Sequence, residues 1–297
     1  MSTNNNHGLF YAIAAYTIWG IVPIYWKQLA YIDSFEIAVH RLVWSCVLVW
    51  LFIVLAKQWR SLAPLLKEKQ TIIRLFLASV LIAGNSVIFI WAINANYIVE
   101  VSMGYFINPL IQVLFGVLFF KERLRGIQWL SIALATIGVI YLIIALGRIP
   151  LVALSLAFSF AFYGVIKKTL TVPAAQGMAI ETACLLIPAV AYLFYIDAQG
   201  DGQFGRVLST DVLLIIGGFF TLAPLMLFSA AAKLISMTAL GMTQYIGPSL
   251  QLITAIFLYN EPFAGAQAVS FVLIWSALII FTLDQIKYSR ARRRASL

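Results

Sequence analysis

The feature that most constrains this chain is a succession of ten long apolar runs separated by short polar turns. Each run holds about 20 mostly apolar residues, enough to cross the hydrocarbon core of a membrane as an α-helix. Backbone groups that face lipid must be hydrogen-bonded within their own segment, so the runs are predicted to be helices, and their continuous apolar character excludes a β-barrel. The predicted spans are Gly8–Lys27, Phe35–Ala56, Thr71–Ile93, Val101–Phe120, Gly126–Leu146, Leu151–Ile166, Gly177–Ile196, Asp211–Ala232, Met237–Tyr259 and Ala266–Asp284.

The composition agrees with an all-α integral membrane protein. Hydrophobic residues make up 63% of the chain and charged residues only 10%, a balance far from that of a soluble domain. The segment before Gly8 holds no lysine or arginine, so we interpret the first run as a retained helix and not as a cleaved signal peptide. Cys46 and Cys184 both fall inside predicted spans, and we expect no disulfide between them.

The basic residues predict the orientation. If the N-terminus is cytoplasmic, sixteen lysines and arginines fall on the cytoplasmic side and three (Lys27, Arg148 and Arg206) fall outside. This bias predicts a multi-pass protein of the inner (plasma) membrane with both termini in the cytoplasm. The net charge of +9 then needs no nucleic-acid partner. We expect the basic tail, residues 287–297, to lie against the headgroups of the lipid bilayer.

The stretch from Met103 to Ser131 occurs twice in the chain. A shift of 139 positions brings eight identical residues opposite one another in 29 gapless positions. The identical pairs are Met103/Met242, Ile107/Ile246, Pro109/Pro248, Gln112/Gln251, Glu122/Glu261, Gly126/Gly265, Gln128/Gln267 and Ser131/Ser270. The pattern predicts a duplication, with residues 1–146 as a first five-helix repeat and residues 147–286 as a second.

Each predicted repeat holds five spans, an odd number, so the second copy must cross the membrane in the opposite sense. The charges agree, because the loop after the fourth span carries Lys121, Arg123 and Arg125, and the corresponding positions of the second copy carry no cation. Inverted-topology repeats are typical of secondary transporters, whose solute site lies near the midplane between the repeats.

The second span carries the most polar intramembrane cluster. Glu36, His40 and Trp44 recur at intervals of four and share one helical face. Arg41 and Ser45 fall on the next face. An arginine this close to the end of a span can extend to the headgroups, but ionisable residues inside spans are functional by default. We predict that His40, Arg41 and Trp44 contact a small-molecule solute.

Amide side chains recur at depth in both copies: Asn85, Asn108, Gln112, Gln244 and Gln251. They can join helices to one another or hydrogen-bond a solute. For the last four we favour a solute cavity, and Asn85 should bond either another helix or a ligand. Prolines beside the polar positions remove backbone hydrogen bonds. The predicted helix-breaking prolines are Pro23, Pro109, Pro224 and Pro248.

Aromatic side chains accompany the amides, and we expect Tyr16, Trp19, Tyr105, Tyr163 and Tyr245 to stack around the solute. For Tyr16 and Trp19, contact with lipid is an equal alternative.

Glu181 is the acidic residue predicted to lie well inside a span. A carboxyl group at this depth is a candidate to carry protons that drive transport. The alternative is a permanent ion pair with Lys167, Lys168 or Lys233, which would serve structure alone.

Several catalytic motifs are absent from the sequence. It has no GxxxxGK[ST] loop for ATP and no HExxH metal motif, and His7 and His40 are its only histidines. We therefore expect no metal, no cofactor and no enzymatic activity.

Particular segments resemble a known family. WGIVPIYWK, EIAVHRLVWS and ETACLLIPA, with the endings NPLIQVLFGVLFFKERL and GPSLQLITAIFLYNEPF, resemble the EamA-type drug/metabolite transporter superfamily and, within it, the RarD-like permeases. The resemblance covers nearly the whole chain. It implies a ten-helix inner-membrane fold with a central cavity lined by both repeats. It also implies a chloramphenicol-sensitivity permease, but no single solute, because the superfamily handles amino acids, other metabolites and nucleotide sugars.

The sequence thus predicts a secondary transporter that exports a small polar or amphipathic metabolite or drug by alternating access. A passive channel is the nearer alternative, and a membrane-embedded enzyme or sensor the more distant one. The fifth and tenth spans are the least polar, so we interpret them as scaffold and as the candidate surface of a homodimer.

Overall fold

A computed structural model describes residues 2–95, 97–259 and 265–294, and within these ranges the chain folds into helices with no strand. The long helices are α1 (Ser2–Trp26), α2 (Ser34–Leu55), α4 (Lys69–Asn94), α5 (Ile98–Phe120), α6 (Gly126–Leu146), α7 (Leu151–Thr169), α8 (Ala174–Gln199), α9 (Leu208–Leu234) and α12 (Ala266–Arg294). The shorter helices are η1 (Lys27–Leu29), η2 (Trp59–Ser61), α3 (Leu62–Lys67), α10 (Met237–Gln244) and α11 (Ile246–Tyr259).

In the described part of the chain, nine helices are long and apolar enough to cross a membrane. The chain is therefore a multi-pass membrane protein. The predicted span Gly126–Leu146 coincides with α6. Six of the other eight predicted spans that match one of these helices begin and end within three residues of their helix, whereas α1 begins six residues before Gly8 and α12 ends ten residues after Asp284. Apolar length predicted these helices well because it is a local property of the sequence.

The ninth predicted span, Met237–Tyr259, is two helices and not one. α10 ends at Gln244 and α11 begins at Ile246, so the chain is interrupted at Tyr245. Pro248 has no N–H with which to bond the carbonyl of Gln244 four residues earlier, and this is the residue at which α10 ends.

The predicted helix breaks at the other three prolines are wrong. Pro23, Pro109 and Pro224 lie inside α1, α5 and α9, which continue through them. A single proline removes one backbone hydrogen bond, and a membrane helix can bridge that loss with a local bend because the rest of its backbone must stay paired in lipid.

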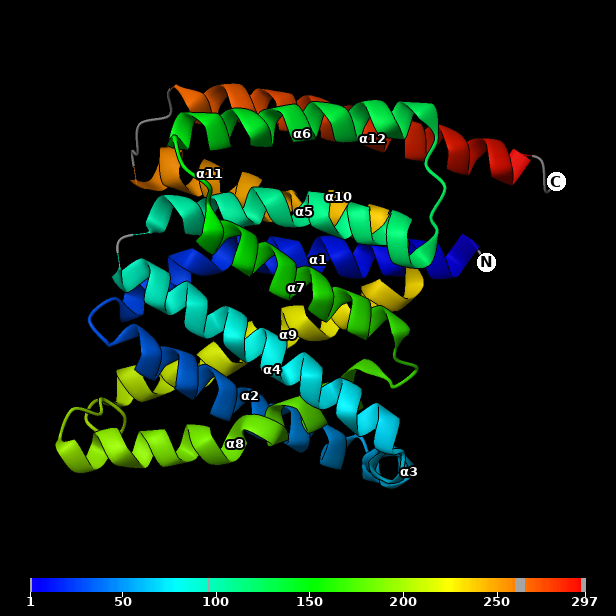
Figure 1. The fold of residues 1–297 in the computed structure, drawn as a ribbon. Helices are drawn as coiled ribbons and strands as arrows, with labels where there is room; N and C mark the ends of the chain where they lie inside the picture. Colours follow the sequence, from blue (N-terminus) through cyan, green and yellow to red (C-terminus); the bar gives the residue numbers. More distant parts are fainter. Residues whose placement is uncertain (1, 96, 260–264, 295–297) are drawn as a thin grey trace.

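The helices lie side by side in one bundle, and both ends of the chain lie at the same end of it, which we call the terminal end (Figure 1). α6 packs on α12 at one edge of the bundle, and α2 packs on α8 at the other. Between these edges, α5 packs on α7 and α10, α1 packs on α9 and α11, α4 packs on α7 and α8, and α2 also packs on α9.

Local signals fix several helix ends. The Asp33 carboxylate accepts hydrogen bonds from the backbone N–H groups of Phe35 and Glu36 at 2.9 and 3.1 Å, which caps α2. Gly147 and Gly200 end α6 and α8 in the left-handed conformation, with φ of 74° and 82°, where glycine carries no Cβ penalty.

The start of α10 is capped from the other half of the chain. The Glu122 carboxylate, in the turn after α5, accepts from the backbone N–H groups of Met237 and Thr238 at 2.6 and 3.0 Å. The Thr238 hydroxyl donates to the same carboxylate at 2.7 Å. A negative charge is stabilised at a helix N-terminus, where N–H groups lack helical partners. This contact fixes α10 against α5.

Candidate functional site

An amide cluster joins three helices in the middle of the bundle. Gln112 Nε2 of α5 donates to Asn108 Oδ1 at 2.9 Å and to Gln244 Oε1 of α10 at 2.8 Å. Asn108 Nδ2 donates to the Ala157 carbonyl of α7 at 2.8 Å. All three side chains are buried. The structure thus brings together three of the amides predicted from the sequence, and two of their three contacts join different helices.

Two buried tyrosines flank the amide cluster. The Tyr245 hydroxyl donates to the Phe106 carbonyl at 3.1 Å, and these two residues occupy equivalent positions 139 apart in the two copies. The Tyr16 hydroxyl of α1 lies within interaction range of the Gln112 amide. Neither that hydroxyl nor Gln112 Oε1 makes a hydrogen bond of regular geometry in the described part of the chain. The cluster therefore retains acceptor and donor capacity.

A cavity lies beside α5 and α11, which hold the two sequence stretches that align at a shift of 139 positions. It has a volume of about 190 Å³ and is lined on the α5 side by Ser102 and Tyr105 and on the α11 side by Pro248 and Gln251. Gln251 Nε2 donates to the Trp19 carbonyl of α1 at 3.1 Å. The 37% exposure of Tyr105, on a helix packed inside the bundle, reflects this opening. Residues of both halves of the chain thus share one cavity.

Arg41 is an arginine inside the bundle. Its Nε donates to the Thr221 hydroxyl of α9 at 2.8 Å, and its guanidinium carbon lies 4.6 Å from the centre of the Trp26 ring of α1. The Thr221 hydroxyl is itself fixed by donating to the Gly217 carbonyl at 3.1 Å. The guanidinium also lies within electrostatic range of the Tyr105 hydroxyl. Arg41 is thus directed toward the interior and not away from it.

His40 faces a different part of the molecule from Arg41. Its Nε2 lies 3.8 Å from the Glu36 carboxylate, which accepts from the backbone N–H of Gln203 at 2.7 Å. The His40 ring packs on Phe204 at 5.1 Å in the connection between α8 and α9. Successive helical residues point about 100° apart, because a turn holds about 3.6 residues. His40 and Arg41, which the sequence puts on adjacent faces of one helix, therefore meet different elements of the bundle.

Trp44 lies one turn after His40, and its ring packs on the same Phe204 at 5.7 Å. The Trp44 Nε1 and His40 Nδ1 atoms are buried, and neither has a hydrogen-bond partner in the described part of the chain. Asn85 has two: its Nδ2 donates to the Leu156 carbonyl at 2.9 Å and to the Ser159 hydroxyl at 2.8 Å. Asn85 therefore joins α4 to α7, which is the first of its two predicted roles.

Aromatic side chains form a layer nearer the terminal end. The ring centre of Trp19 lies 5.7 Å from the ring centres of Tyr16 and Phe160. The rings of Phe228 and Tyr163 are stacked, with 5.9 Å between their centres and an angle of 17° between their planes. Trp19 precedes Trp26 by seven positions, which is about 10 Å along α1 at a rise of about 1.5 Å per residue. The layer separates Arg41 from the terminal end of the bundle.

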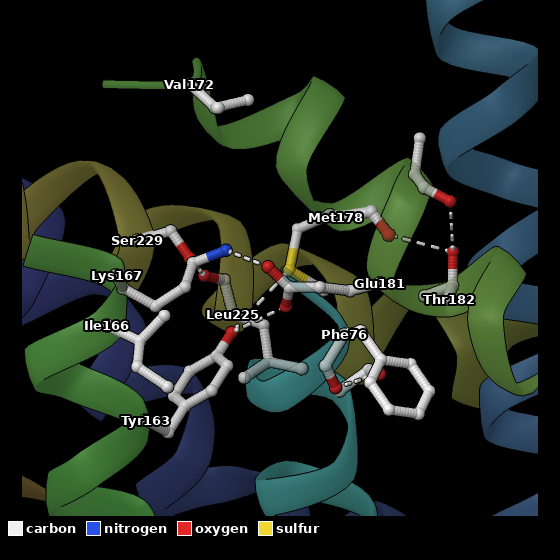
Figure 2. A network of polar contacts seen from close by, with 12 residues as sticks. Phe76, Tyr163, Ile166, Lys167, Val172, Met178, Glu181, Thr182, Leu225 and Ser229 are labelled. Atoms are coloured by element: carbon white, nitrogen blue, oxygen red, sulfur yellow. Dashed lines mark hydrogen bonds and ion pairs between the residues drawn. The ribbon is translucent and has the colours of Figure 1, made fainter. Parts of the chain in front are cut away.

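A buried ion pair lies between this layer and the terminal end, and Figure 2 shows it. Lys167 Nζ of α7 lies 2.5 Å from Glu181 Oε1 of α8, and both side chains are 2% exposed. The Tyr163 hydroxyl donates to Glu181 Oε2 at 3.3 Å, from the same side as Lys167 (Figure 2). The pair predicted as the structural alternative for Glu181 is therefore present, with Lys167 as the partner among the three candidate lysines.

The two other lysines serve as helix ties. Lys168 Nζ donates to the Ala232 carbonyl at 3.1 Å and to the Ile235 carbonyl, at the end of α9. Lys233 Nζ donates to the Val172 carbonyl, between α7 and α8. With the ion pair, these contacts fasten α7, α8 and α9 together at the terminal end.

Sequence reasoning missed two residues of the Arg41 surroundings, Trp26 and Thr221. Trp26 carried no signal because tryptophan is common near the ends of membrane helices, and Thr221 carried none because threonine is ordinary in an apolar span. Within residues 2–95, 97–259 and 265–294, no group of three or more His, Cys, Asp or Glu side chains could hold a metal ion.

Comparison with known proteins identifies the family. The model of the EamA-like transporter family matches residues 6–144. An uncharacterized transporter of Vibrio cholerae is 43% identical over 289 residues, which cover 97% of this chain and 96% of that one. Protein RarD of Escherichia coli is 42% identical over 284 residues, covering 95% and 96%. The chain belongs to the EamA-like transporter family.

Two further proteins are similar to this chain at lower sequence identity. The chloramphenicol-sensitive protein RarD of Pseudomonas aeruginosa is 27% identical over 297 residues, covering 99% of both chains. A solved crystal structure of a protein matches with a TM-score of 0.73 over 93% of this chain and 97% of that one. At 16% identity this second likeness concerns the fold alone. The chain is thus a RarD-like EamA protein and a membrane transporter, as the sequence resemblance predicted.

Proposed function

We propose that this EamA protein is a secondary transporter that moves a small polar or amphipathic solute across the inner membrane by alternating access, with net export. The observation that carries the proposal is the cavity shared by Tyr105 of the first half and Gln251 of the second. Secondary transporters built from inverted repeats bind their solute between the repeats near the midplane.

Helix packing supports the ten-span, two-repeat architecture that the proposal needs. In the duplication α1 corresponds to α7, α2 to α8, α4 to α9, α5 to α10 with α11, and α6 to α12. This exchange turns the packed pairs α5–α7, α1–α9 and α2–α9 into α1–α11, α4–α7 and α4–α8, which also pack. The pairs α6–α12, α2–α8 and α5–α10 map onto themselves. Such a pattern is expected of a pseudo-two-fold axis in the membrane plane.

The proposed solute contacts are Tyr105 and Gln251, which line the cavity, together with Arg41, Tyr16 and Gln112, which are not among its lining residues. His40 and Trp44 remain proposed contacts through their unpartnered buried nitrogens. The other proposed contacts are Trp19, Asn85, Asn108, Tyr163, Gln244 and Tyr245. For these, the helix-to-helix contacts described above are the competing role.

The proposed cycle requires one end of the bundle to be shut while the other opens. The aromatic layer, the Lys167–Glu181 pair and the ties from Lys168 and Lys233 all lie on the terminal side of Arg41. We take this side as cytoplasmic, in line with the basic residues. These contacts must separate for the solute to exchange with the cytoplasm, and Glu181 is then a candidate to carry a proton. No enzymatic step is part of the proposal.

Counterflow in proteoliposomes tests the proposal. Vesicles with the purified protein are loaded with a defined mixture of amino acids, organic acids, nucleosides, sugar phosphates and chloramphenicol, and mass spectrometry follows the exchange of each compound. We expect saturable exchange of one chemical class, accelerated when the same compound is present on the other side. The Ser102→Trp variant, which fills the cavity, should lose the exchange.

Two outcomes would contradict the proposal. Flux that rises linearly with concentration, without stimulation from the opposite side, would favour a passive channel. Exchange that is no faster than in protein-free vesicles for every compound of the mixture would remove the transport proposal for these solute classes.

A further inference from the structure

Several cations inside or at the edges of the bundle pair with a carboxylate or donate to a backbone carbonyl. Arg41 has neither kind of partner within the described residues. Lys167 pairs with Glu181 at 2.5 Å and Arg148 pairs with Glu100 at 2.9 Å, while Lys168 and Lys233 donate to backbone carbonyls. Within the described residues, Arg41 forms no ion pair. A cation in a low-dielectric interior without a counter-ion is costly, so an anion that binds there is favoured.

The terminal nitrogens of Arg41 are available to a ligand. Only its Nε makes a hydrogen bond in the described part of the chain, to Thr221. The two Nη atoms have no hydrogen-bond partner there and are not fully buried, although the residue as a whole is only partly exposed. Two adjacent N–H donors of a guanidinium match the two oxygens of a carboxylate or a phosphate in a planar, bidentate contact.

The arginine is held in position before any ligand arrives. The Trp26 ring lies under its guanidinium at 4.6 Å, and Thr221 fixes its Nε at 2.8 Å. A side chain at Gly217 would meet the Trp26 ring at 3.1 Å and Arg41 Cγ at 3.7 Å, so the absence of a side chain there makes room for this stack. Side chains fixed in this way lose less conformational entropy on binding.

The cavity that Tyr105 lines sets the size and character of the rest of the ligand. Tyr105 lines it and lies within electrostatic range of Arg41. Phe106 and Leu252 contribute apolar walls, and Ser102 and Gln251 offer two polar groups. The volume is about 190 Å³, and a cavity of about 150 Å³ is known to accept a benzene-sized molecule. One ring or a short aliphatic chain therefore fits.

We infer that the solute class of this transporter is a small organic anion, with its carboxylate or phosphate on the Arg41 fork and a single ring or short chain against Tyr105. This inference rests on the proposed transport function and narrows it to one charge type.

Binding to the purified protein in detergent tests the charge requirement directly. The probes are benzoate, phenylphosphate and hexanoate, with benzamide as the neutral match of benzoate, each measured by calorimetric titration. We expect at least one anion to bind and benzamide to bind about tenfold to a hundredfold more weakly, since a hydrogen bond between charged groups contributes about 1.5–3 kcal/mol. Equal binding of benzoate and benzamide, or no binding of any anion, would overturn the inference.

Variants locate the charge on Arg41. Arg41→Gln should lose the preference for the anion, and Arg41→Lys should lose most of it because an ammonium lacks the planar fork. Lys27→Gln is the matched control, because Lys27 is an exposed cation one position after Trp26 and should bind the anion as the unchanged protein does. Undiminished anion binding by a folded Arg41→Gln protein would contradict the assignment.

A lipid headgroup offers the same phosphate chemistry, and a further arm separates the two sources. Phosphatidylglycerol added to the micelles should leave benzoate binding unchanged if the site is reached from the cavity. Displacement of benzoate by this lipid would assign Arg41 to a headgroup and overturn the inference.

Counterflow of neutral compounds alone would also overturn the inference while leaving the transport function intact. Absence of all counterflow would count against the transport function itself.

Discussion

The buried pair of Lys167 and Glu181 yields the sharpest energetic prediction. Both side chains are 2% exposed and their charged atoms lie 2.5 Å apart. Replacing Lys167 with Met keeps the length of the side chain and removes its charge. Glu181 then keeps only the Tyr163 hydroxyl, at 3.3 Å, as a partner. An unpaired buried carboxylate is the costly product of this change, rather than the lost attraction alone.

The expected loss follows from that burial. Removing one partner of a buried pair costs about 3–5 kcal/mol, whereas replacing both partners with neutral groups is often close to neutral. Lys167→Met should therefore destabilise the protein by about 3–5 kcal/mol, and Glu181→Gln should do so by a similar amount. The double variant should lose less than either single variant, so the interaction energy in the double-mutant cycle should exceed about 3 kcal/mol.

Unfolding midpoints of the four proteins in one detergent measure this cycle, with intrinsic tryptophan fluorescence as the signal. Lys67→Met is the matched control, since Lys67 is an exposed lysine at the end of α3. It should change stability by no more than about 0.5 kcal/mol. A Lys167→Met protein as stable as this control, or a double variant that loses the sum of the two single effects, would refute the reasoning.

Three other predictions address packing, topology and coupling. Gly218→Ala should destabilise the protein by about 1–3 kcal/mol, because the new Cβ would lie 2.5 Å from Trp44 Cβ. Gly84→Ala should stabilise the protein by up to about 1 kcal/mol in the same unfolding assay, because no atom lies within 4 Å of its new Cβ. Single cysteines at Gln58 and Gln203, in a protein lacking Cys46 and Cys184, should be labelled from opposite sides of the membrane; labelling from one side would contradict the topology. If Glu181 carries the proton, Glu181→Gln should abolish flux driven by a pH gradient and preserve solute counterflow. Unchanged pH-driven flux would remove Glu181 from coupling.

The inverted repeat also predicts that Asn260 lies on the same side of the membrane as Gln203, and the labelling prediction has structural support at two of these three positions. Gln203 bonds Glu36 in the first turn of α2, and Gln58 follows the end of the same helix. The two positions therefore lie at opposite ends of one membrane-spanning helix. Asn260, the third position, lies outside the described residues.

The second span illustrates how far sequence reasoning reached at the candidate site. Its polar residues were predicted correctly to lie within a helix, α2, and that prediction needed only periodicity. The sequence placed His40 and Arg41 on adjacent faces of this helix but could not say which elements the two faces meet. His40 meets Phe204 of the α8–α9 connection and Arg41 meets Thr221 of α9, and neither contact leaves a trace in the local sequence.

The buried amides show the same limit, because the sequence does not reveal their hydrogen-bond partners. The sequence placed Asn85, Asn108 and Gln112 at depth, where each must find a partner. It left open whether the partner is a helix or a solute. Asn85 and Asn108 bond carbonyls of α7, which come 71 and 49 positions later in the chain. Gln251 bonds a carbonyl 232 positions earlier, yet also lines the cavity.

The sequence by itself determined that this chain is a bundle of membrane helices and where most of those helices begin and end, and it predicted that one stretch is duplicated. These properties are local, since apolar length, backbone pairing and turn residues act within a few positions. Only the tertiary structure decided that Lys167, and not Lys168 or Lys233, pairs with Glu181, and that Arg41 has no carboxylate partner in the described chain. Polar groups in an apolar interior bind whatever partner the packing brings within hydrogen-bond distance, and that depends on how distant helices cross.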